Sequence, residues 1–493
     1  MNNVIGVLHT NFVYKNNNGM KYYKLTTSHG NNYLAECPNK LLTNNYYVIV
    51  KPTKYIFNNM IVAQIETLIG KIGTSNADLD YLLYINDLKF NQSKIDESIY
   101  LENSKFNNRI KLDNINVFTI DSFGCEDRDD AISVKYINNN TFDLYVHISD
   151  VTSFIKYNSS LFNDCIESTA SIYVYLNKIF HMLPFELIRK HLSLNSDNNY
   201  KQCISVIFRI KNNEIVNYNI ELTKIKINYN LNYEDTYTPN ELVNDINLIK
   251  NFLVNKLNDK ISPTNNIYKQ IIDKLMILTN SVIGSMLSSK KCKFIQRTTD
   301  NDNKSIYVYD DKNHLHKQLN INNYVHFTSP IRRLSDMLTH YIVKKYLLND
   351  NNNFVITNDM ISHINNMETK MKKIQGLFKL HNVLYNIDNV DNDIVDVVFN
   401  EFNYNTGRIT LYIPKYDIII SPILYHISQR KYITYDELNN TLYKINNNNK
   451  ISYSFSKFST LKIKIILCKN EINFNDKIKI IIMDNYWNNF INV

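Results

Sequence analysis

The chain has 493 residues, 44% of them hydrophobic, and a net charge of +8, so it can form several domains with buried cores. The moderate positive charge is compatible with a polyanionic partner. Its six cysteines include no C-x-x-C pair, which argues against a disulfide frame and structural zinc. No apolar run approaches the roughly 20 residues that cross a bilayer. We therefore expect no membrane partner and a cytoplasmic protein, of cellular or viral origin.

Residues 1–70 contain short β-like runs separated by Asn and Gly turns and no convincing helix. The runs lie at 4–8, 21–25, 46–50 and 60–65. This length and pattern predict a small OB or cold-shock-like β-barrel. Residues 71–115 are polar and mixed, and we expect them to form a linker.

Residues 116–385 read as strands first and helices later, which is the order of an α+β domain. Helical periodicity predicts helices over 267–287, 330–348 and 359–384, with Ser329 as the N-cap and Pro330 as the first residue of the second. Alternating strand patterns then return at 409–413, 418–420, 461–467 and 478–483. They predict an OB-like barrel over 386–493, so the expected fold class is multi-domain α+β with a central domain between two β-barrels.

Four aspartates are crowded into ten residues after a strand-like segment, at Asp121, Asp127, Asp129 and Asp130. Such carboxylates repel one another unless a cation neutralises them, and hard oxygen donors favour Mg²⁺ or Mn²⁺ over zinc. The spacing lacks the glycine and final glutamate of an EF-hand calcium loop. A catalytic metal site, a structural metal site and a solvated acidic turn remain the alternatives at this point.

A second polar group lies about 200 residues later, in the segment Thr328-Ser329-Pro330-Ile331-Arg332-Arg333. A Ser-Pro helix start would leave backbone N–H groups free, and an arginine in the first turn would add a bidentate donor for phosphate. The alternative is an ordinary capped helix in which Arg333 pairs with Asp336. Together with the acidic run, this segment suggests phosphodiester cleavage.

Four sequence segments occur in the order and separation typical of one protein family. They read Ile120-Asp121 with Glu126-Asp127-Arg128-Asp129-Asp130-Ala131-Ile132, Val146-His147-Ile148-Ser149-Asp150-Val151, Met182-Leu183-Pro184, and Phe327-Thr328-Ser329-Pro330-Ile331-Arg332-Arg333. The chain thus resembles the RNase II/RNase R (RNB) exoribonucleases over about 116–345. The segment 409–416 resembles the C-terminal OB domain of the catalytic subunit of the eukaryotic exosome.

The resemblance implies roles for individual residues. It implies that Asp121, Asp127, Asp129 and Asp130 form the metal site, and that Asp129 and Arg332 act at the scissile phosphate. Further RNA contacts are expected from Tyr173 or Tyr175, one of which would stack on the 3′-terminal base, and from Thr328, Ser329, Arg332 and Arg333. For His147 and Asp150 the resemblance implies a mainly architectural role. Lys274 departs from the acidic residue usual in relatives.

The function implied is a processive 3′-to-5′ exoribonuclease that hydrolyses single-stranded RNA to nucleoside 5′-monophosphates with Mg²⁺, or Mn²⁺. We expect single-stranded RNA as partner, no nucleotide cofactor, and a monomer. A catalytically silent RNA-binding protein on the same scaffold is the alternative, and a DNA-directed nuclease rests only on generic phosphodiester chemistry.

Overall fold

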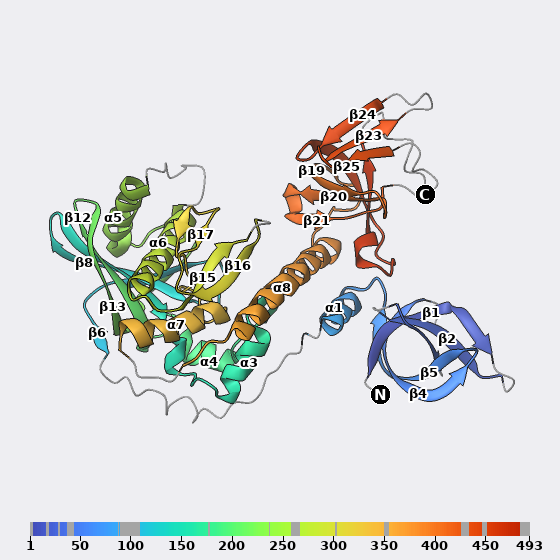
Figure 1. Ribbon diagram of the computed structural model, residues 1–493, viewed down its shortest axis with the longest axis horizontal. Helices are drawn as coiled ribbons and strands as arrows, with labels where there is room; N and C mark the ends of the chain where they lie inside the picture. Colours follow the sequence, from blue (N-terminus) through green and yellow to red (C-terminus); the bar gives the residue numbers. More distant parts are fainter. Residues whose placement is uncertain are drawn as a thin grey trace. The chain divides into compact units, whose positions relative to one another are not determined.

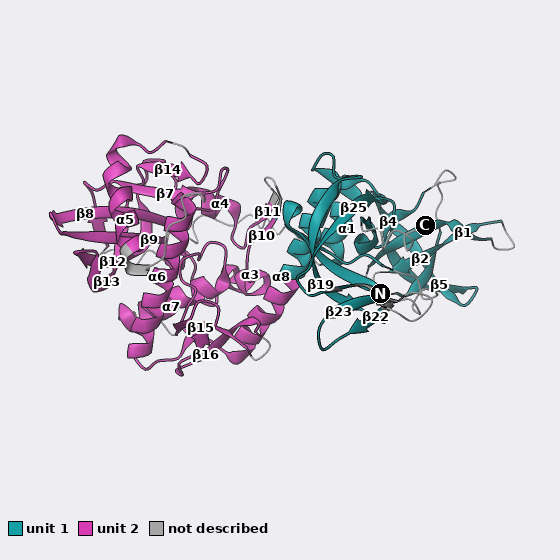
Figure 2. Ribbon diagram, turned by 90° about the horizontal axis from the view of Figure 1, so that it is seen from above, with its two compact units in different colours: residues 1–91, 174–176, 372–493 teal, residues 92–173, 177–371 magenta. Residues whose placement is uncertain are grey.

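The computed structural model describes residues 3–15, 19–27, 30–36, 44–86, 88, 109–175, 178–235, 237–257, 267–300, 303–349, 354–424, 433–445 and 451–483. The chain divides into two compact units (Figure 2). Unit 1 comprises residues 1–91, 174–176 and 372–493, and unit 2 comprises residues 92–173 and 177–371. The division thus falls inside helix α8 (Asn358–Tyr385). The domain boundaries expected from the sequence stay a prediction.

The N-terminal part of unit 1 is a closed five-stranded barrel in the strand order β1-β2-β3-β5-β4 (Figure 1). Its strands are β1 (Val4–Lys15), β2 (Lys21–Thr27), β3 (Asn32–Glu36), β4 (Tyr46–Phe57) and β5 (Met60–Lys71). Apolar side chains that alternate along the strands meet inside the barrel, among them Leu8, Leu25, Val48 and Val50. The short strand β3 has no counterpart among the predicted runs and closes the barrel by pairing in parallel with β5.

The expected linker begins with a helix, α1 (Ser75–Ile85), whose side chain Asp78 is fully buried. Asp78 accepts a hydrogen bond from the Tyr385 hydroxyl at 2.6 Å and lies 3.0 Å from Nζ of Lys477. These contacts neutralise a carboxylate that burial would otherwise disfavour. Helix α1 is therefore a packed part of unit 1.

The C-terminal part of unit 1 contains two antiparallel sheets. The first has the order β21-β20-β19-β25-β26 and the second the order β22-β23-β24. Over the described residues the five-stranded sheet does not close into a barrel. Its strands are β19 (Ile394–Asn403), β20 (Arg408–Ile413), β21 (Ile418–Ile420), β25 (Thr460–Leu467) and β26 (Ile478–Ile482), and those of the second are β22 (Ile433–Asp436), β23 (Thr441–Ile445) and β24 (Ile451–Ser456).

Unit 2 is built on a seven-stranded sheet in the order β14-β7-β8-β9-β12-β13-β6. The central strands are antiparallel, and the edge strands β14 and β6 pair in parallel with β7 and β13. The strands are β6 (Ile110–Leu112), β7 (Val117–Asp121), β8 (Asp130–Asn138), β9 (Thr141–Ser149), β12 (Lys201–Lys211), β13 (Glu214–Ile225) and β14 (Tyr229–Asn232). Strand β9 is buried along its whole length, as expected for the middle of a covered sheet.

Together with this sheet, helices and short hairpins form the main hydrophobic cluster of unit 2 (Figure 1). The helices are α3 (Ser160–Ser168), α4 (Phe185–Leu187), α5 (Asn240–Leu257), α6 (Ile267–Ser289), α7 (Leu334–Leu347) and the first part of α8, and the hairpins are β10 (Ile172–Tyr175) with β11 (Lys178–Phe180), β15 (Phe294–Thr299) with β16 (Ser305–Asp310), and β17 (Leu315–His316) with β18 (Ile321–Asn322). On α6, a Cβ at Gly284 would lie 1.7 Å from the carbonyl oxygen of Asn323, so only glycine fits there.

Helix α6 corrects one expectation from the sequence. By length and composition alone, it is apolar enough to cross a membrane. Nine of its residues are buried within unit 2, including Ile271, Leu275 and Ile283, which belong to the main hydrophobic cluster. Its apolar character therefore matches that of a helix in a globular core.

Helix α7 begins at Leu334, four residues later than predicted. Residues 329–333 form a tight turn instead, because side chains capture its backbone groups. The amide of Ser329 donates to Oδ1 of Asp336 at 2.8 Å, and the amide of Ile331 donates to Oδ1 of Asp129 at 2.8 Å. The predicted helix start with free amide groups, and with it the amide part of the phosphate clamp, is wrong.

Candidate active site

The four aspartates lie at one end of the sheet in unit 2. Asp121 ends β7 and Asp130 begins β8, so the loop between these strands carries Asp127 and Asp129. Both ends of the loop are fixed by the backbone: the amide of Tyr233 donates to the carbonyl of Asp121 at 2.7 Å, and the amide of Ser149 donates to the carbonyl of Asp129 at 2.9 Å. The sheet therefore places the four carboxylates close together.

These aspartates line a cavity of about 510 Å³, and Thr328, Ser329, Arg332 and Arg333 also line it. The two segments are distant in sequence. The remaining lining residues come mainly from α6 and from the region before α7. The sequence-predicted members that line the cavity are Asp121, Asp127, Asp129, Asp130, Tyr173, Thr328, Ser329, Arg332 and Arg333.

Arg332 faces Asp129. Its Nε lies 3.2 Å from Oδ2 of Asp129, and its Nη2 donates to the hydroxyl of Ser329 at 3.2 Å. The other oxygen of Asp129 accepts from the amide of Ile331, as described above. The arginine side chain is nearly half exposed, whereas Asp129 is buried. Arg332 can therefore meet an anion in the cavity while it remains next to the acidic loop.

Arg333, in contrast, forms an ion pair with another side chain of the protein. Its Nε and Nη2 each donate to one oxygen of Asp336 at 2.9 Å, in a bidentate pair. This is the helix-capping alternative that the sequence left open for this residue. An RNA contact of Arg333 stays a prediction.

Tyr173 reaches the acidic loop from strand β10. Its hydroxyl donates a hydrogen bond to Oδ2 of Asp127, and its side chain is 38% exposed, so part of the ring remains open. The backbone bridge between Ala170 and Arg333 brings β10 close to the arginine turn. The side chain of Tyr175, the other candidate, lies outside the described residues.

Arg128 is a member of the site to which sequence reasoning gave no role. Its Nη1 donates to Oδ1 of Asn195 at 2.7 Å, and its Nε lies 3.4 Å from Oδ2 of Asp121. Its amide donates to the hydroxyl of Ser193 at 3.1 Å, and its carbonyl accepts from the amide of Leu194. The feature of the sequence that could have indicated this role is the position of Arg128, a basic residue in the middle of the acidic run.

Two further cavity residues also escaped the sequence interpretation. Asp273 on α6 and Tyr233 after β14 both line the cavity, and burial raises the pKa of each. Asp273 directly precedes Lys274, the position at which the chain departs from the acidic residue usual in relatives. A carboxylate therefore faces the cavity from α6 despite that departure.

Burial raises the pKa of three of the four aspartates. For Asp130 burial, followed by the charge of Asp121, raises the pKa to about 7. The pKa of Asp129 is raised well above its usual value, because burial outweighs the attraction of Arg332. Burial also raises the pKa of Asp121, against the opposing influence of Arg128. A nearby cation would offset this cost and favour the charged forms.

The donor chemistry of the loop fits a hard divalent cation. Oδ2 of Asp121 and Oδ2 of Asp129 are buried and make no hydrogen bond, and each lies near an arginine Nε, at 3.4 and 3.2 Å. Four carboxylates face two guanidinium groups here, so the group carries a formal charge of 2 − 4 = −2. Within the described part of the chain, however, no three acidic, His or Cys side chains converge closely enough to hold an ion. Side chains would therefore have to turn toward a bound metal.

His147 and Asp150 lie inside unit 2 rather than in the cavity. His147 is fully buried between the hydroxyls of Ser133, at 2.8 Å, and Ser205, at 2.6 Å. Asp150 forms a buried ion pair with Arg109 and a second with Lys344 at 2.8 Å. Both residues support the strands that carry the acidic loop, in keeping with the architectural role expected from the resemblance.

A family model described as "RNB domain" matches residues 109–247 and 303–349. Ribonuclease R 2 of Lactococcus lactis is 23% identical over 404 residues, which cover 61% of this chain and 59% of that protein. The "Exosome complex exonuclease RRP44 homolog A" of Arabidopsis thaliana is 30% identical over 138 residues, or 26% of this chain and 15% of that protein. The chain spans less than two thirds of the length of these relatives.

Solved structures share the fold. The apo form of Mycoplasma genitalium RNase R matches with a TM-score of 0.76, at 16% identity, over 97% of this chain and 89% of that chain. Its complex with ribose methylated single-stranded RNA matches with a TM-score of 0.75, at the same identity and coverage. Yeast Ssd1, described as a pseudonuclease, matches with a TM-score of 0.61 at 15% identity, over 90% of this chain and 67% of that chain.

These matches confirm the expected fold class, a multi-domain α+β protein with OB-type modules. They also agree with the order of the sequence motifs. Residues 109–247 and 303–349 thus match the RNB domain, and the chain is similar to proteins named Ribonuclease R and to an exosome exonuclease.

Proposed function

We propose that the protein is a processive 3′-to-5′ exoribonuclease that hydrolyses single-stranded RNA to nucleoside 5′-monophosphates. The observation that supports this most is the meeting of four aspartates and Arg332 at one cavity. With Arg128 beside Asp121, this group carries a formal charge of 2 − 4 = −2. The curated relatives with the same domain include proteins named Ribonuclease R. An acidic oxygen cluster beside an arginine is suited to phosphodiester chemistry.

Mg²⁺, or Mn²⁺ in its place, is the proposed cofactor, and Asp121, Asp127, Asp129 and Asp130 are the residues that would hold it. When bound, the ion would polarise the scissile phosphate and lower the pKa of the attacking water. The charge deficit of the aspartate group equals the charge of one divalent ion. The two buried carboxylate oxygens without hydrogen bonds are the first candidates for its ligands.

The remaining roles belong to the chain's own side chains. Arg332 would neutralise negative charge that develops on the phosphoryl oxygens, because its half-exposed guanidinium adjoins the cavity. Asp129 would position the attacking water or a second ion. The ring of Tyr173, held by its hydroxyl on Asp127, would stack on the 3′-terminal base. Thr328 and Ser329 line the same cavity and would contact the RNA backbone.

Single-stranded RNA is the proposed partner, and the proposed active form is a monomer. Support comes from the fold, since M. genitalium RNase R has the same fold and was solved with single-stranded and with double-stranded RNA. The barrel of β1–β5 would guide the strand by phosphate contacts and base stacking. Binding should then weaken steeply with salt and depend little on sequence.

The test is to change Asp129 to Asn and assay a 3′-labelled single strand with Mg²⁺. We expect the wild-type chain to release labelled mononucleotides and Asp129→Asn to lose at least about 100-fold in rate, as is common for groups that act in the transition state. Asp143→Asn is the matched control, since Asp143 pairs with Arg209 away from the cavity. Undiminished release by Asp129→Asn would contradict the assignment.

A second candidate is an RNA-binding protein without turnover. The observation that favours it is the structural likeness to Ssd1, described as a pseudonuclease. Retention of all four aspartates argues for the enzyme. Tight binding of single-stranded RNA by the wild-type chain, with no product in Mg²⁺ or Mn²⁺, would establish the silent protein instead.

A further inference from the structure

Asp129 uses its two carboxylate oxygens differently. Oδ1 accepts the amide hydrogen of Ile331 at 2.8 Å, which fixes the carboxylate against the arginine turn. Oδ2 is buried and makes no hydrogen bond, and Nε of Arg332 lies 3.2 Å from it. A cation that binds to Oδ2 would therefore compete with Arg332 for the same oxygen.

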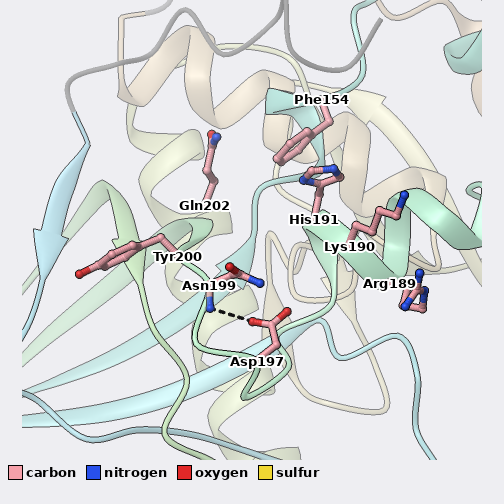
Figure 3. A pocket seen from close by; sticks show the side chains of 8 residues that line it. All are labelled: Phe154, Arg189, Lys190, His191, Asp197, Asn199, Tyr200 and Gln202. Carbon is pink, nitrogen blue, oxygen red and sulfur yellow. Dashed lines mark hydrogen bonds between the residues drawn. The ribbon is translucent and has the colours of Figure 1, made fainter. Parts of the chain in front are cut away.

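Asp197, which lines another pocket of unit 2, shows how the protein holds a carboxylate that needs no further partner. That pocket has a volume of about 570 Å³. Oδ1 of Asp197 accepts the amide hydrogen of Asn199 at 3.0 Å (Figure 3). Its Oδ2 accepts from Nζ of the buried Lys201 at 2.9 Å. Both oxygens of Asp197 are thus hydrogen-bonded within the protein, whereas Oδ2 of Asp129 is not.

Of the two arginines beside the acidic loop, Arg332 is the one that can leave. Its side chain is 46% exposed, and its Nη2 donates to the hydroxyl of Ser329 at 3.2 Å. Arg128 is 16% exposed, and its Nη1 donates to Oδ1 of Asn195 at 2.7 Å. A partly exposed guanidinium loses little when it exchanges one charged oxygen for another. Arg332 can therefore turn from Asp129 to a phosphate.

The departure of Arg332 would change the charge of the aspartate group. With both arginines in place, the four carboxylates and the two guanidinium groups carry a formal charge of 2 − 4 = −2. Without Arg332 the charge is 1 − 4 = −3, so a divalent cation is attracted more strongly. The reverse also holds, because a cation at Oδ2 of Asp129 frees Arg332 for an anion.

We propose that Arg332 couples two binding events at this cavity, so that the phosphate of an RNA end raises the affinity for the divalent ion. The ion must then raise the affinity for the RNA end by the same factor, because binding linkage is reciprocal. This coupling rests on the proposed function, since the acidic loop must hold the ion and Arg332 must contact the phosphate. It requires no hydrolysis, so binding measurements test it separately from turnover.

The test is to measure Mn²⁺ binding to the full chain from the electron paramagnetic resonance signal of the free ion, with and without a 2′-O-methyl oligoadenylate. Electrophoresis checks that the oligonucleotide stays intact, and Mn²⁺ bound by the oligonucleotide alone is subtracted. We expect the oligonucleotide to raise the Mn²⁺ affinity of the wild-type chain about tenfold, as is usual for coupled sites.

Arg332→Met removes the cation that competes for Asp129. Without RNA, this variant should bind Mn²⁺ about tenfold more tightly than the wild type, and the oligonucleotide should then add less than about twofold. Arg209→Met is the matched control, because it removes the same charge from an exposed pair with Asp143, and neither residue lines the cavity. It should leave the Mn²⁺ affinity unchanged, with and without the oligonucleotide. Thermal unfolding checks that both variants fold.

Three results would overturn the coupling: no Mn²⁺ binding by the wild type with the oligonucleotide, an unchanged Mn²⁺ affinity of Arg332→Met without RNA, or the full oligonucleotide effect in that variant. The outcome is distinguishable from that of the nuclease proposal. A wild-type chain that shows the coupling but releases no mononucleotides from unmodified RNA supports the coupling and contradicts the nuclease. A chain that hydrolyses RNA without the coupling does the reverse.

Discussion

Asp150 and the four aspartates of the acidic loop lie in neighbouring parts of unit 2 and differ in how their negative charge is balanced. Asp150, just after β9, pairs with Arg109 and Lys344, so two cations face one carboxylate. Burial alone would raise its pKa, but Lys344 and Arg109 prevail and hold the pKa well below its usual value. In the acidic loop, four carboxylates share Arg128 and Arg332. The loop is thus deficient in positive charge where its neighbour has an excess.

The pairing of Asp150 with Arg109 and Lys344 shows that this fold can fully neutralise the charge of a buried aspartate. The two groups are only one hydrogen bond apart, since the amide of Ser149 donates to the carbonyl of Asp129 at 2.9 Å. Because cationic side chains are present so close to the acidic loop, their absence from this region does not explain why the loop has too little positive charge. Uncompensated carboxylates are a feature expected of a site that takes up a cation.

The largest effect should come from Asp150→Asn. It leaves Arg109 and Lys344 buried without a counter-charge, and we expect a loss of about 3–5 kcal/mol in the free energy of unfolding. Urea unfolding measures it. Asp143→Asn is the control, because its partner Arg209 is 49% exposed, so the change leaves no cation buried without a counter-charge and should cost less. Equal losses in the two variants would mean that Asp150 is not held by a buried, charge-balanced pair, and the contrast with the acidic loop would no longer stand.

The second-largest effect on the free energy of unfolding should come from Arg128→Met. It takes the charge of the acidic loop from −2 to −3, and we expect a loss of about 2 kcal/mol in the metal-free protein, less than for a fully buried pair. Addition of Mg²⁺ should then stabilise the variant more than the wild type. Thermal unfolding with and without Mg²⁺ measures both effects, and Arg189→Met, which removes an exposed pair, is the control. No difference in the Mg²⁺ response would mean that Arg128 does not share the charge of the loop.

His147→Gln should change the dependence of stability on pH. Burial lowers the pKa of His147 to about 3, so the folded protein keeps it neutral while the unfolded chain protonates it below about 6.5. Its contribution is complete above pH 6.5 and is lost as pH falls toward 3, by up to about 1.4 kcal/mol per pH unit. Unfolding free energies between pH 7 and 4.5 should fall less steeply in the variant. Parallel curves for variant and wild type would rule this contribution out.

The smallest effect, and the one of opposite sign, is expected for Asp129→Asn. It removes one of the mutually repelling carboxylates while an amide oxygen can still accept from the amide of Ile331, so the metal-free protein should gain up to about 1 kcal/mol. Urea unfolding in EDTA measures the gain. A clear loss of stability would mean that the pair with Arg332 outweighs the repulsion, and that the loop is balanced like Asp150.

Much of the fold was accessible from sequence because hydrophobic periodicity marks long elements. Helix α6 was predicted from Ile267 and α8 within one residue at each end. The start of α7 was missed because Ser329 and Ile331 give their amide hydrogens to Asp336 and Asp129. Such tertiary contacts override the local preference for a helix after Ser-Pro. Strand β3 was missed because its sequence, NYLAE, begins with Asn and ends with Ala and Glu, which are uncommon in strands.

For the candidate site, the sequence identified the residue types but could not reveal their partners. The spacing of the aspartates predicted a cluster, and the cavity brings them together with Arg332. Side-chain direction decided the rest: Arg332 turns to Asp129, and the adjacent Arg333 turns to Asp336. The i,i+3 spacing allowed the pair of Arg333 with Asp336, but no local pattern indicated that Arg332 would turn to Asp129, which is distant in sequence. The role of Arg128 likewise depends on Asn195, which only the fold places beside it.

The hydrogen bond from Ile331 to Asp129 has a consequence for how the protein is made. It joins residues 202 positions apart, and the backbone contacts of Ser171 and Ala170 with Arg332 and Arg333 likewise bridge early and late parts of the chain. During translation, the acidic loop therefore emerges long before the arginine turn that completes the cavity. A nascent chain cannot assemble the whole cavity until most of its length has left the ribosome.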